Sequence, residues 1–249
     1  MARLPRFFIA PSQVNGAVIT VTDEDVRHIA AVLRMKTGDE LLLCDGRGTE
    51  YRSRIAELGK TEIKAEVLSS EQREVRGPRI VLGQGIAKSD KMDWIVQKAT
   101  ELGVSSIVPL VTERTIVKVK DEEKRVTRWQ KICREAAMQS NRPDIPKVEA
   151  IASLGDFILS PATGYRQQGP GSLLLLPWEE AAEPIKNVLR SHADSEQVIV
   201  LIGPEGGFSK KEADLAIARG FHSVSLGTNI LRTETAAIAV LGMIGYECS

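Results

Sequence analysis

The sequence predicts an α/β protein of two domains, in which a small N-terminal β-barrel precedes a parallel sheet covered by helices on both faces. Three observations carry this prediction. Short strand-like runs separated by turn residues occupy the chain up to Leu68, and strand-like and helix-like segments alternate after Pro78. Between them the polar run Ser69 to Gly77 is typical of a linker. We therefore expect one domain over residues 1–72 and a second over residues 73–249.

The N-terminal domain is expected to be mostly β-structure. Its turn signals are Gly38-Asp39, Asp45-Gly46 and Gly59-Lys60, and they separate strands expected at 17–21, 40–44, 49–55 and 62–67. One helix is expected from Asp23 to Arg34, with Thr22 as its N-cap, because apolar residues recur there at helical spacing.

The C-terminal domain is expected to alternate strands with helices. Its strands are expected at 79–83, 107–111, 173–176, 198–202 and 223–226, and their alternation with helices predicts a parallel sheet covered on both faces. Helices are expected at 90–102, 209–219 and 233–246, and Ser209 with Glu212 forms a capping box at the start of the second. The last helix is apolar almost all round, which predicts that a second subunit or the core covers it.

Composition excludes several classes of protein. The chain carries 33 basic and 33 acidic residues, so a nucleic-acid partner must be held by a local patch. The three cysteines are far apart and suggest neither a disulfide framework nor a zinc site, so we expect no bound metal. This use of cysteine is consistent with a protein of the reducing cytoplasm. No apolar run approaches the roughly 18 residues of a membrane span. The best candidate for a nucleic-acid-binding patch is a cluster of basic residues between Arg114 and Lys147, and a solvated helix face is the competing interpretation. The residues of this basic patch are Arg114, Lys118, Lys120, Lys124, Arg125, Arg128, Lys131, Arg134, Arg142 and Lys147.

The segment that follows the apolar run Val198 to Ile202 is the most informative in the chain. It has the sequence Gly203-Pro204-Glu205-Gly206-Gly207-Phe208, and its glycines permit positive φ and close approach by another group. Ligands in open α/β sheets bind beyond the carboxyl ends of strands. Neither a dinucleotide fingerprint nor a Walker loop is present, and Glu205 repels phosphate but tolerates a sulfonium ligand. A tight turn without a ligand is the competing interpretation.

A second strand end repeats this arrangement. Gly227 ends the strand, Thr233 is positioned to cap the next helix, and Glu234 falls in its first turn, where negative charge is favoured. Arg232 precedes an apolar helix and is hard to explain by packing, so we assign it to function.

Together these motifs resemble the small-subunit ribosomal RNA uracil-N3 methyltransferase family of the SPOUT superfamily of knotted methyltransferases. The likeness covers nearly the whole chain. The matching motifs are Arg6-Phe7-Phe8, His28 with Val32-Leu33-Arg34, Gly38-Asp39, Asp45-Gly46, Lys98 to Val104, Glu113-Arg114, Glu135-Ala136 with Gln139-Ser140 and Arg142, Ile202 to Phe208, Leu226-Gly227 and Ile230 to Ala236.

The resemblance implies a PUA-like β-barrel that helps to hold RNA, then a methyltransferase domain with a trefoil knot, in a homodimer. It also implies S-adenosylmethionine as cofactor, bound against three loops. The residues so implied are Leu176, Ile202, Gly203, Pro204, Glu205, Gly206, Leu226, Gly227, Asn229, Ile230, Leu231 and Thr233.

The implied activity is methylation of N3 of a uridine in 16S ribosomal RNA, on a partly assembled small subunit. Arg232 and Arg114 are expected to orient the uracil, and Glu205 or Glu234 to accept its proton. RNA contacts are expected from Arg6, His28, Arg34 and Arg142, since arginine binds phosphate through two donors.

One departure and two alternatives accompany this interpretation. Thr228 and Asn229 stand where the family usually has proline and a basic residue, which puts an RNA contact in doubt. A ribose 2′-O-methyltransferase of the same fold is the enzymatic alternative. The second alternative is a non-catalytic protein that binds RNA during ribosome assembly. Carbon methylation is disfavoured because no cysteine lies in an activating context.

Overall fold

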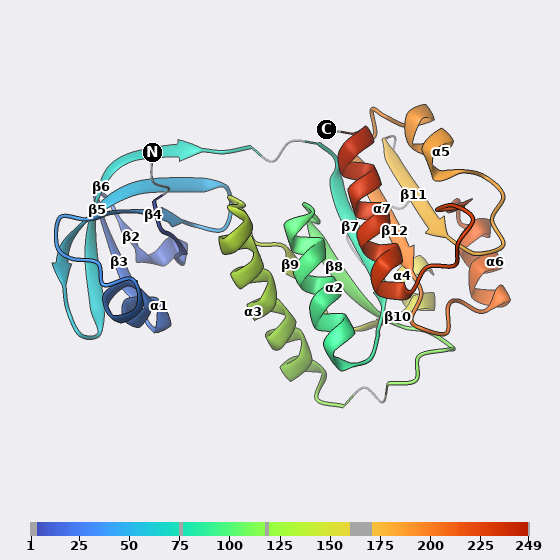
Figure 1. The fold of residues 1–249 in the computed structure, drawn as a ribbon, viewed down its shortest axis with the longest axis horizontal. Helices are drawn as coiled ribbons and strands as arrows, with labels where there is room; N and C mark the ends of the chain where they lie inside the picture. The colour runs from blue at the N-terminus through green and yellow to red at the C-terminus, as the bar shows by residue number, and fades with distance from the viewer. Residues whose placement is uncertain (1–3, 75–76, 118–119, 160–170, 249) are drawn as a thin grey trace. The chain divides into compact units, whose positions relative to one another are not determined.

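The computed structural model describes residues 4–74, 77–117, 120–159 and 171–248, and Lys118 of the basic patch lies outside them. The chain forms two compact units. The first comprises Met1–Val75 and Ala137–Ile145, and the second comprises Arg76–Ala136 and Pro146–Ser249. The strands and helices of both units are labelled in Figure 1.

The described part of the first unit contains a sheet in the order β1-β4-β5-β6-β3-β2. Neighbouring strands are antiparallel except β1 and β4, which run parallel. The four expected strands are confirmed, whereas β1 and β2 were too short to predict. The strands are β1 (Arg6–Phe8), β2 (Val14–Asn15), β3 (Val18–Thr22), β4 (Glu40–Cys44), β5 (Thr49–Leu58) and β6 (Glu62–Gln72).

Two boundaries in this unit differ from the expectation. The run Ser69 to Gln72 belongs to strand β6, because it pairs with β5 from Arg52 to Thr49, so the linker is shorter than expected. The expected helix is α1 (Glu24–Arg27) continued by a turn of π-helix, η2 (His28–Val32). Thr22 does not cap this helix, because Asp23 is its N-cap residue. The Thr22 hydroxyl instead donates to Asp23 Oδ2 at 2.8 Å.

Arg6 and Arg142 lie in the interior of the first unit, which contradicts their expected RNA contacts. Arg6 is 8% exposed, and its Nη1 donates to Glu50 Oε1 at 2.7 Å, to Cys44 Sγ at 3.1 Å and to the Arg142 carbonyl at 3.1 Å. The Arg142 side chain is also buried and forms an ion pair with Asp144. Burial raises the pKa of the Cys44 thiol to about 11, so this cysteine stays protonated.

His28 and Arg34 are both exposed, as an RNA contact requires. The His28 ring packs edge-on against Phe7, with 5.5 Å between the ring centroids. Their contact with RNA stays a prediction.

The second unit is built on a parallel sheet in the order β10-β8-β7-β12-β11-β13, with β9 beside β8. The five expected strands are confirmed. The strands are β7 (Arg79–Gly85), β8 (Ser106–Val111), β9 (Lys147–Val148), β10 (Ala152–Ser153), β11 (Ser172–Pro177), β12 (Gln197–Ile202) and β13 (His222–Val224).

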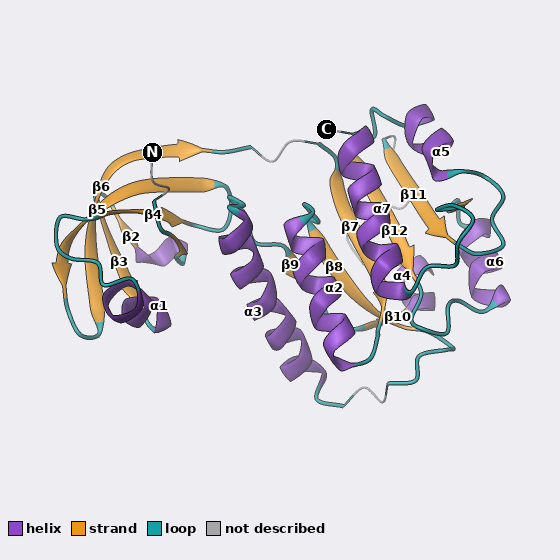
Figure 2. Ribbon diagram, in the orientation of Figure 1, coloured by secondary structure: helices purple, strands orange, loops and turns teal. Residues whose placement is uncertain are grey.

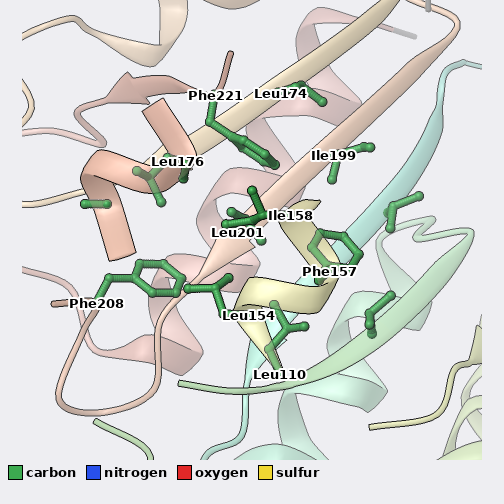
Figure 3. Close-up of a cluster of buried hydrophobic side chains, with 14 residues drawn as sticks. Leu110, Leu154, Phe157, Ile158, Leu174, Leu176, Ile199, Leu201, Phe208 and Phe221 are labelled. Carbon is green, nitrogen blue, oxygen red and sulfur yellow. The ribbon is translucent and has the colours of Figure 1, made fainter. Parts of the chain in front are cut away.

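Helices cover both faces of this sheet, as Figure 2 shows. Helices α2 and α7 pack together on one face, and α4 and α6 contribute to the cluster of buried side chains on the other. Phe157 and Leu201 lie in that cluster in Figure 3. The helices are α2 (Ser89–Glu101), α3 (Glu122–Ser140), α4 (Leu154–Leu159), α5 (Ile185–Ser191), α6 (Lys210–Ala218) and α7 (Thr233–Glu247).

The predicted capping box of α6 is confirmed. Ser209 Oγ accepts from the Glu212 N–H at 3.2 Å, and Glu212 Oε2 accepts from the Ser209 N–H at 2.9 Å. No helix within the described ranges is both long and apolar enough for a membrane span.

We predict that Arg6→Met destabilises the first unit by about 3 kcal/mol, the lower end of the range for breaking a buried ion pair. The lower end applies because Arg73 Nη1 still lies 3.0 Å from Glu50 Oε1. Urea denaturation measures the change. The matched control is Arg52→Met, which removes a surface ion pair with Glu40 and should change stability little. Unchanged stability in the Arg6 variant would contradict the interior role.

Candidate functional site

A cleft lies in the second unit where strands β11, β12 and β13 reach their carboxyl ends. It consists of a cavity of about 410 Å³ and an adjoining one of about 120 Å³. The larger falls within the volume range of small-molecule sites. Both are lined by Pro177, Trp178, Glu179, Ile230, Leu231 and Ala236.

The cleft brings together nearly all the predicted cofactor residues. Those that line it are Ile202, Gly203, Pro204, Glu205, Gly206, Leu226, Gly227, Asn229, Ile230, Leu231 and Thr233. Leu176 does not, because its side chain is buried in the core cluster shown in Figure 3. The chain reaches the cleft directly after this residue, at Pro177.

Sequence reasoning missed several residues of the cleft. Trp178 and Glu179 follow β11, and the position of that strand end was the signal that would have found them. Lys91 comes from α2, far away in the sequence, and the sequence carried no signal for it. Gly207, Phe208, Ser225, Thr228 and Ala236 complete the lining.

The first loop of the cleft, residues 203–208 after β12, brings backbone atoms unusually close together. A Cβ atom at Gly203 would lie 2.9 Å from the Gly207 carbonyl carbon, and one at Gly85 would lie 2.5 Å from the Pro204 nitrogen. Gly207 has a φ of +67°, in the region that favours glycine. Gly206 is constrained instead by the Arg114 side chain, whose Cβ would lie 3.0 Å from an added Cβ. Of Gly206 and Gly207, which both permit positive φ, only Gly207 adopts it.

The Thr233 hydroxyl joins three segments under this loop. Its Oγ1 donates to the Gly203 carbonyl at 2.6 Å and accepts from Gln84 Nε2 at 3.0 Å. Gln84 is fully buried near the end of β7. Thr233 is therefore not the helix cap that its position predicted, because Arg232 is the N-cap residue of α7. Its hydroxyl fastens the first loop to the start of α7.

Arg114 acts on the same loop from outside the cleft. Its Nη1 donates to the Gly206 carbonyl at 2.9 Å. The turn that carries Arg114 is held in place by Glu212, whose Oε1 accepts from the Glu113 N–H at 2.8 Å. The capping-box glutamate therefore also positions the arginine, and Arg114 does not line the cleft.

Glu205 stands in a group of charges at one side of the larger cavity. Its Oε1 accepts from the Lys88 N–H at 3.0 Å and lies 3.7 Å from Lys91 Nζ. Partial burial by itself raises the pKa of Glu205, but the backbone hydrogen bonds and the charge of Lys91 outweigh it and hold that pKa below its usual value. The carboxylate is therefore a weak proton acceptor at neutral pH.

The second loop, residues 225–232 between β13 and α7, presents to the cleft an apolar side chain and backbone N–H groups that have no hydrogen-bond partner in the described part of the chain. Among the residues that the structure describes, the N–H groups of Ile230 and Leu231 donate no hydrogen bond. The Ile230 side chain is 87% exposed. Gly227 has a φ of +128°, and a Cβ there would meet nothing within 4 Å. A flat heterocycle with donors and acceptors on its edge fits such a surface.

Arg232 lies at the edge of the larger cavity. Its side chain is exposed and, within the described part of the chain, forms no hydrogen bond or ion pair. It is thus available to an anionic or carbonyl oxygen in the cleft.

Models of two families match the chain. An RNA methyltransferase domain matches residues 75–245, and an RNA methyltransferase PUA domain matches residues 21–68. A relative from Synechocystis sp., ribosomal RNA small subunit methyltransferase E, is 34% identical over 240 residues, which are 96% of this chain and 76% of the relative.

Two solved structures resemble the whole chain. One is a ribosomal RNA small subunit methyltransferase E from Neisseria gonorrhoeae bound to S-adenosyl methionine, with a TM-score of 0.86 and 31% identity. The other is a putative methyltransferase from Legionella pneumophila in complex with the same cofactor, with a TM-score of 0.86 and 30% identity. Each comparison covers 98% of both chains.

We predict that Thr233→Val lowers the free energy of unfolding of the second unit by about 1–3 kcal/mol. The substitution keeps the side-chain shape but leaves Gln84 Nε2 and the Gly203 carbonyl each with one hydrogen bond fewer. Thermal and urea denaturation measure the effect. Thr235→Val, at an exposed position of the same helix, is the control and should be nearly neutral. Equal stability of the two variants would contradict the role of the hydroxyl.

Proposed function

This chain belongs to the ribosomal RNA small subunit methyltransferase E family, and we propose that it methylates N3 of a uridine in 16S ribosomal RNA. S-adenosylmethionine is the methyl donor. The observation that carries the proposal is the cleft itself, whose first and second loops match the family's motifs and lie together at the strand ends.

The residues present fit S-adenosylmethionine. The first loop is tightly folded, because a Cβ at Gly203 would lie 2.9 Å from the Gly207 carbonyl carbon, and this packing holds its backbone in place at the larger cavity. The second loop offers the unused N–H groups of Ile230 and Leu231 to the edge of an adenine ring. Glu205 tolerates the positive sulfonium. Ile202, Pro204, Gly206, Leu226, Gly227 and Asn229 supply the remaining cofactor contacts that we propose.

When bound, the cofactor supplies an electrophilic methyl group on a sulfonium. Its methyl group would pass to N3 with the S–CH3 electron pair left on sulfur, and the N3 proton would pass to solvent. The protein contributes chiefly by positioning the base in line with the methyl group. Arg232 orients the uracil and steadies the negative charge on its oxygens.

The structure favours supporting roles for the other two predicted catalytic residues. Arg114 holds the Gly206 carbonyl and thereby sets the shape of the cofactor loop. Glu205 accepts from the Lys88 N–H and has a lowered pKa, so it serves better as a fixed charge than as the proton acceptor.

We propose that the first unit is a PUA-like barrel and that the second contains the trefoil knot of the family. The sheet order of the first unit, with long strands β5 and β6 at its centre, supports the former. The match of the RNA methyltransferase domain to residues 75–245 supports the latter.

The RNA partner is held by local basic residues. His28, at the start of η2, and Arg34, two residues after its end, are exposed, which supports their proposed RNA contacts. Arg128, on α3, forms an exposed ion pair with Asp93, so part of the basic patch is a solvated helix face. A ribosomal RNA substrate implies a cytoplasmic protein.

We further propose a homodimer. Helix α7 leaves the apolar side chains of Ile238 and Met243 only partly buried, and Tyr246 is 84% exposed. A second copy that covers this helix would remove that surface from water.

The test of the function is a methyl-transfer assay on deproteinised ribosomal RNA and on small subunits from a strain that lacks the enzyme. We expect N3-methyluridine in the product digest by mass spectrometry, with subunits the better substrate. A 2′-O-methylated nucleoside would support the ribose alternative. RNA binding without cofactor binding in calorimetry would support the non-catalytic alternative.

We predict that Arg232→Ala lowers the turnover number by about 10²-fold or more, the usual effect of removing a group that stabilises developing negative charge. Affinity for the cofactor should hardly change, since the side chain forms no bond to the cofactor loops within the described residues. Single-turnover kinetics and calorimetry measure the two quantities. A weaker cofactor affinity with unchanged turnover would reverse the assignment.

A further inference from the structure

Lys91 is the second cation of the larger cavity, and neither the predicted site nor the proposed roles use it. It lies in the first turn of α2 and lines the cavity together with Arg232. Two carboxylates flank its ammonium, Glu205 from the first loop and Glu234 from the start of α7.

The two carboxylates lie near the Lys91 ammonium but do not use all of its hydrogen-bond donors. Lys91 Nζ lies 3.7 Å from Glu205 Oε1 and 3.5 Å from Glu234 Oε2, longer than the 2.7–2.9 Å of a charge-assisted hydrogen bond. On the same helix Lys98 lies 2.8 Å and 3.0 Å from the two oxygens of Glu101. The Lys91 ammonium therefore keeps donor capacity for an acceptor in the cleft.

The two parts of the cleft differ in charge. The smaller cavity is lined by the second loop and contains no lysine or arginine, among the residues described. Both cations belong to the larger cavity alone. A base that loses a proton gains negative charge, and that charge is stabilised beside these two cations.

From this arrangement we infer that Lys91 donates a hydrogen bond to a carbonyl oxygen of the acceptor uracil and stabilises its negative charge. The inference rests on the proposed function. N3 lies between the two ring carbonyls, so the charge left by its proton spreads onto their oxygens. The proton passes to solvent, and the N3–CH3 bond then forms as the S–CH3 bond breaks. Lys91 is thus a catalytic residue in addition to Arg232.

Removing this charge should make the N3 proton harder to remove. Loss of the Lys91 charge also removes one of the causes that hold the pKa of Glu205 low, whereas the other charged groups at the site are present in every variant. Those groups are Lys88, Glu179, Glu205, Arg232 and Glu234.

The experiment compares the wild type with Lys91→Met, Lys91→Arg and the control Lys98→Met. We expect Lys91→Met to lower turnover at saturating cofactor and subunits by about 10²-fold or more. The rising limb of its pH–rate profile should move to higher pH, while cofactor affinity in calorimetry stays close to that of the wild type. Lys91→Arg should restore part of the rate, and Lys98→Met should behave as the wild type.

Two results would overturn the inference. One is a loss of cofactor affinity with normal turnover at saturating cofactor, which would assign the ammonium to the cofactor carboxylate. The other is a lower rate with an unmoved pH profile and a lower melting temperature, which would mean a structural role. If the wild type itself forms no N3-methyluridine, the proposed function fails and the inference falls with it.

Discussion

The candidate site depends on one buried hydroxyl. Thr233 Oγ1 bonds the Gly203 carbonyl and Gln84 Nε2, so three segments that are remote in sequence meet at a single atom. It fastens the first loop, whose Pro204 packs closely against Gly85, to the start of α7. The Gln84 side chain is fully buried, so water cannot replace its hydrogen bond to Thr233.

Further polar contacts extend this constraint outward. Glu212 closes the cap of α6 and also holds the turn that carries Arg114, which in turn binds the Gly206 carbonyl. The backbone N–H of Lys88, the N-cap residue of α2, and the ammonium of Lys91 on that helix both approach Glu205. The loop is therefore fixed from several helices before any ligand arrives. A preorganised site of this kind loses less entropy on binding and aligns the reacting atoms better.

The two units use charge in opposite ways. In the first, Arg6 and Arg142 are buried and paired, and they hold the segment Ala137–Ile145 in the unit. In the second unit, Arg232 and Lys91 line a cavity and keep hydrogen-bond donors available to a ligand. Burial with a partner thus distinguishes the structural cations of the first unit from the two cations that we propose act on a substrate.

The sequence by itself determined the strands, most helices and both loops of the cleft, because short-range patterns encode them. Apolar runs, glycines after strands and a capping box are read within a few residues. Only the tertiary structure decided that Arg6 is buried, that Thr233 binds Gly203 instead of capping α7, and that Lys91 meets Glu205 and Glu234. Those contacts join residues far apart in the chain, and the order of strands in the sheet, which no local pattern specifies, brings them together.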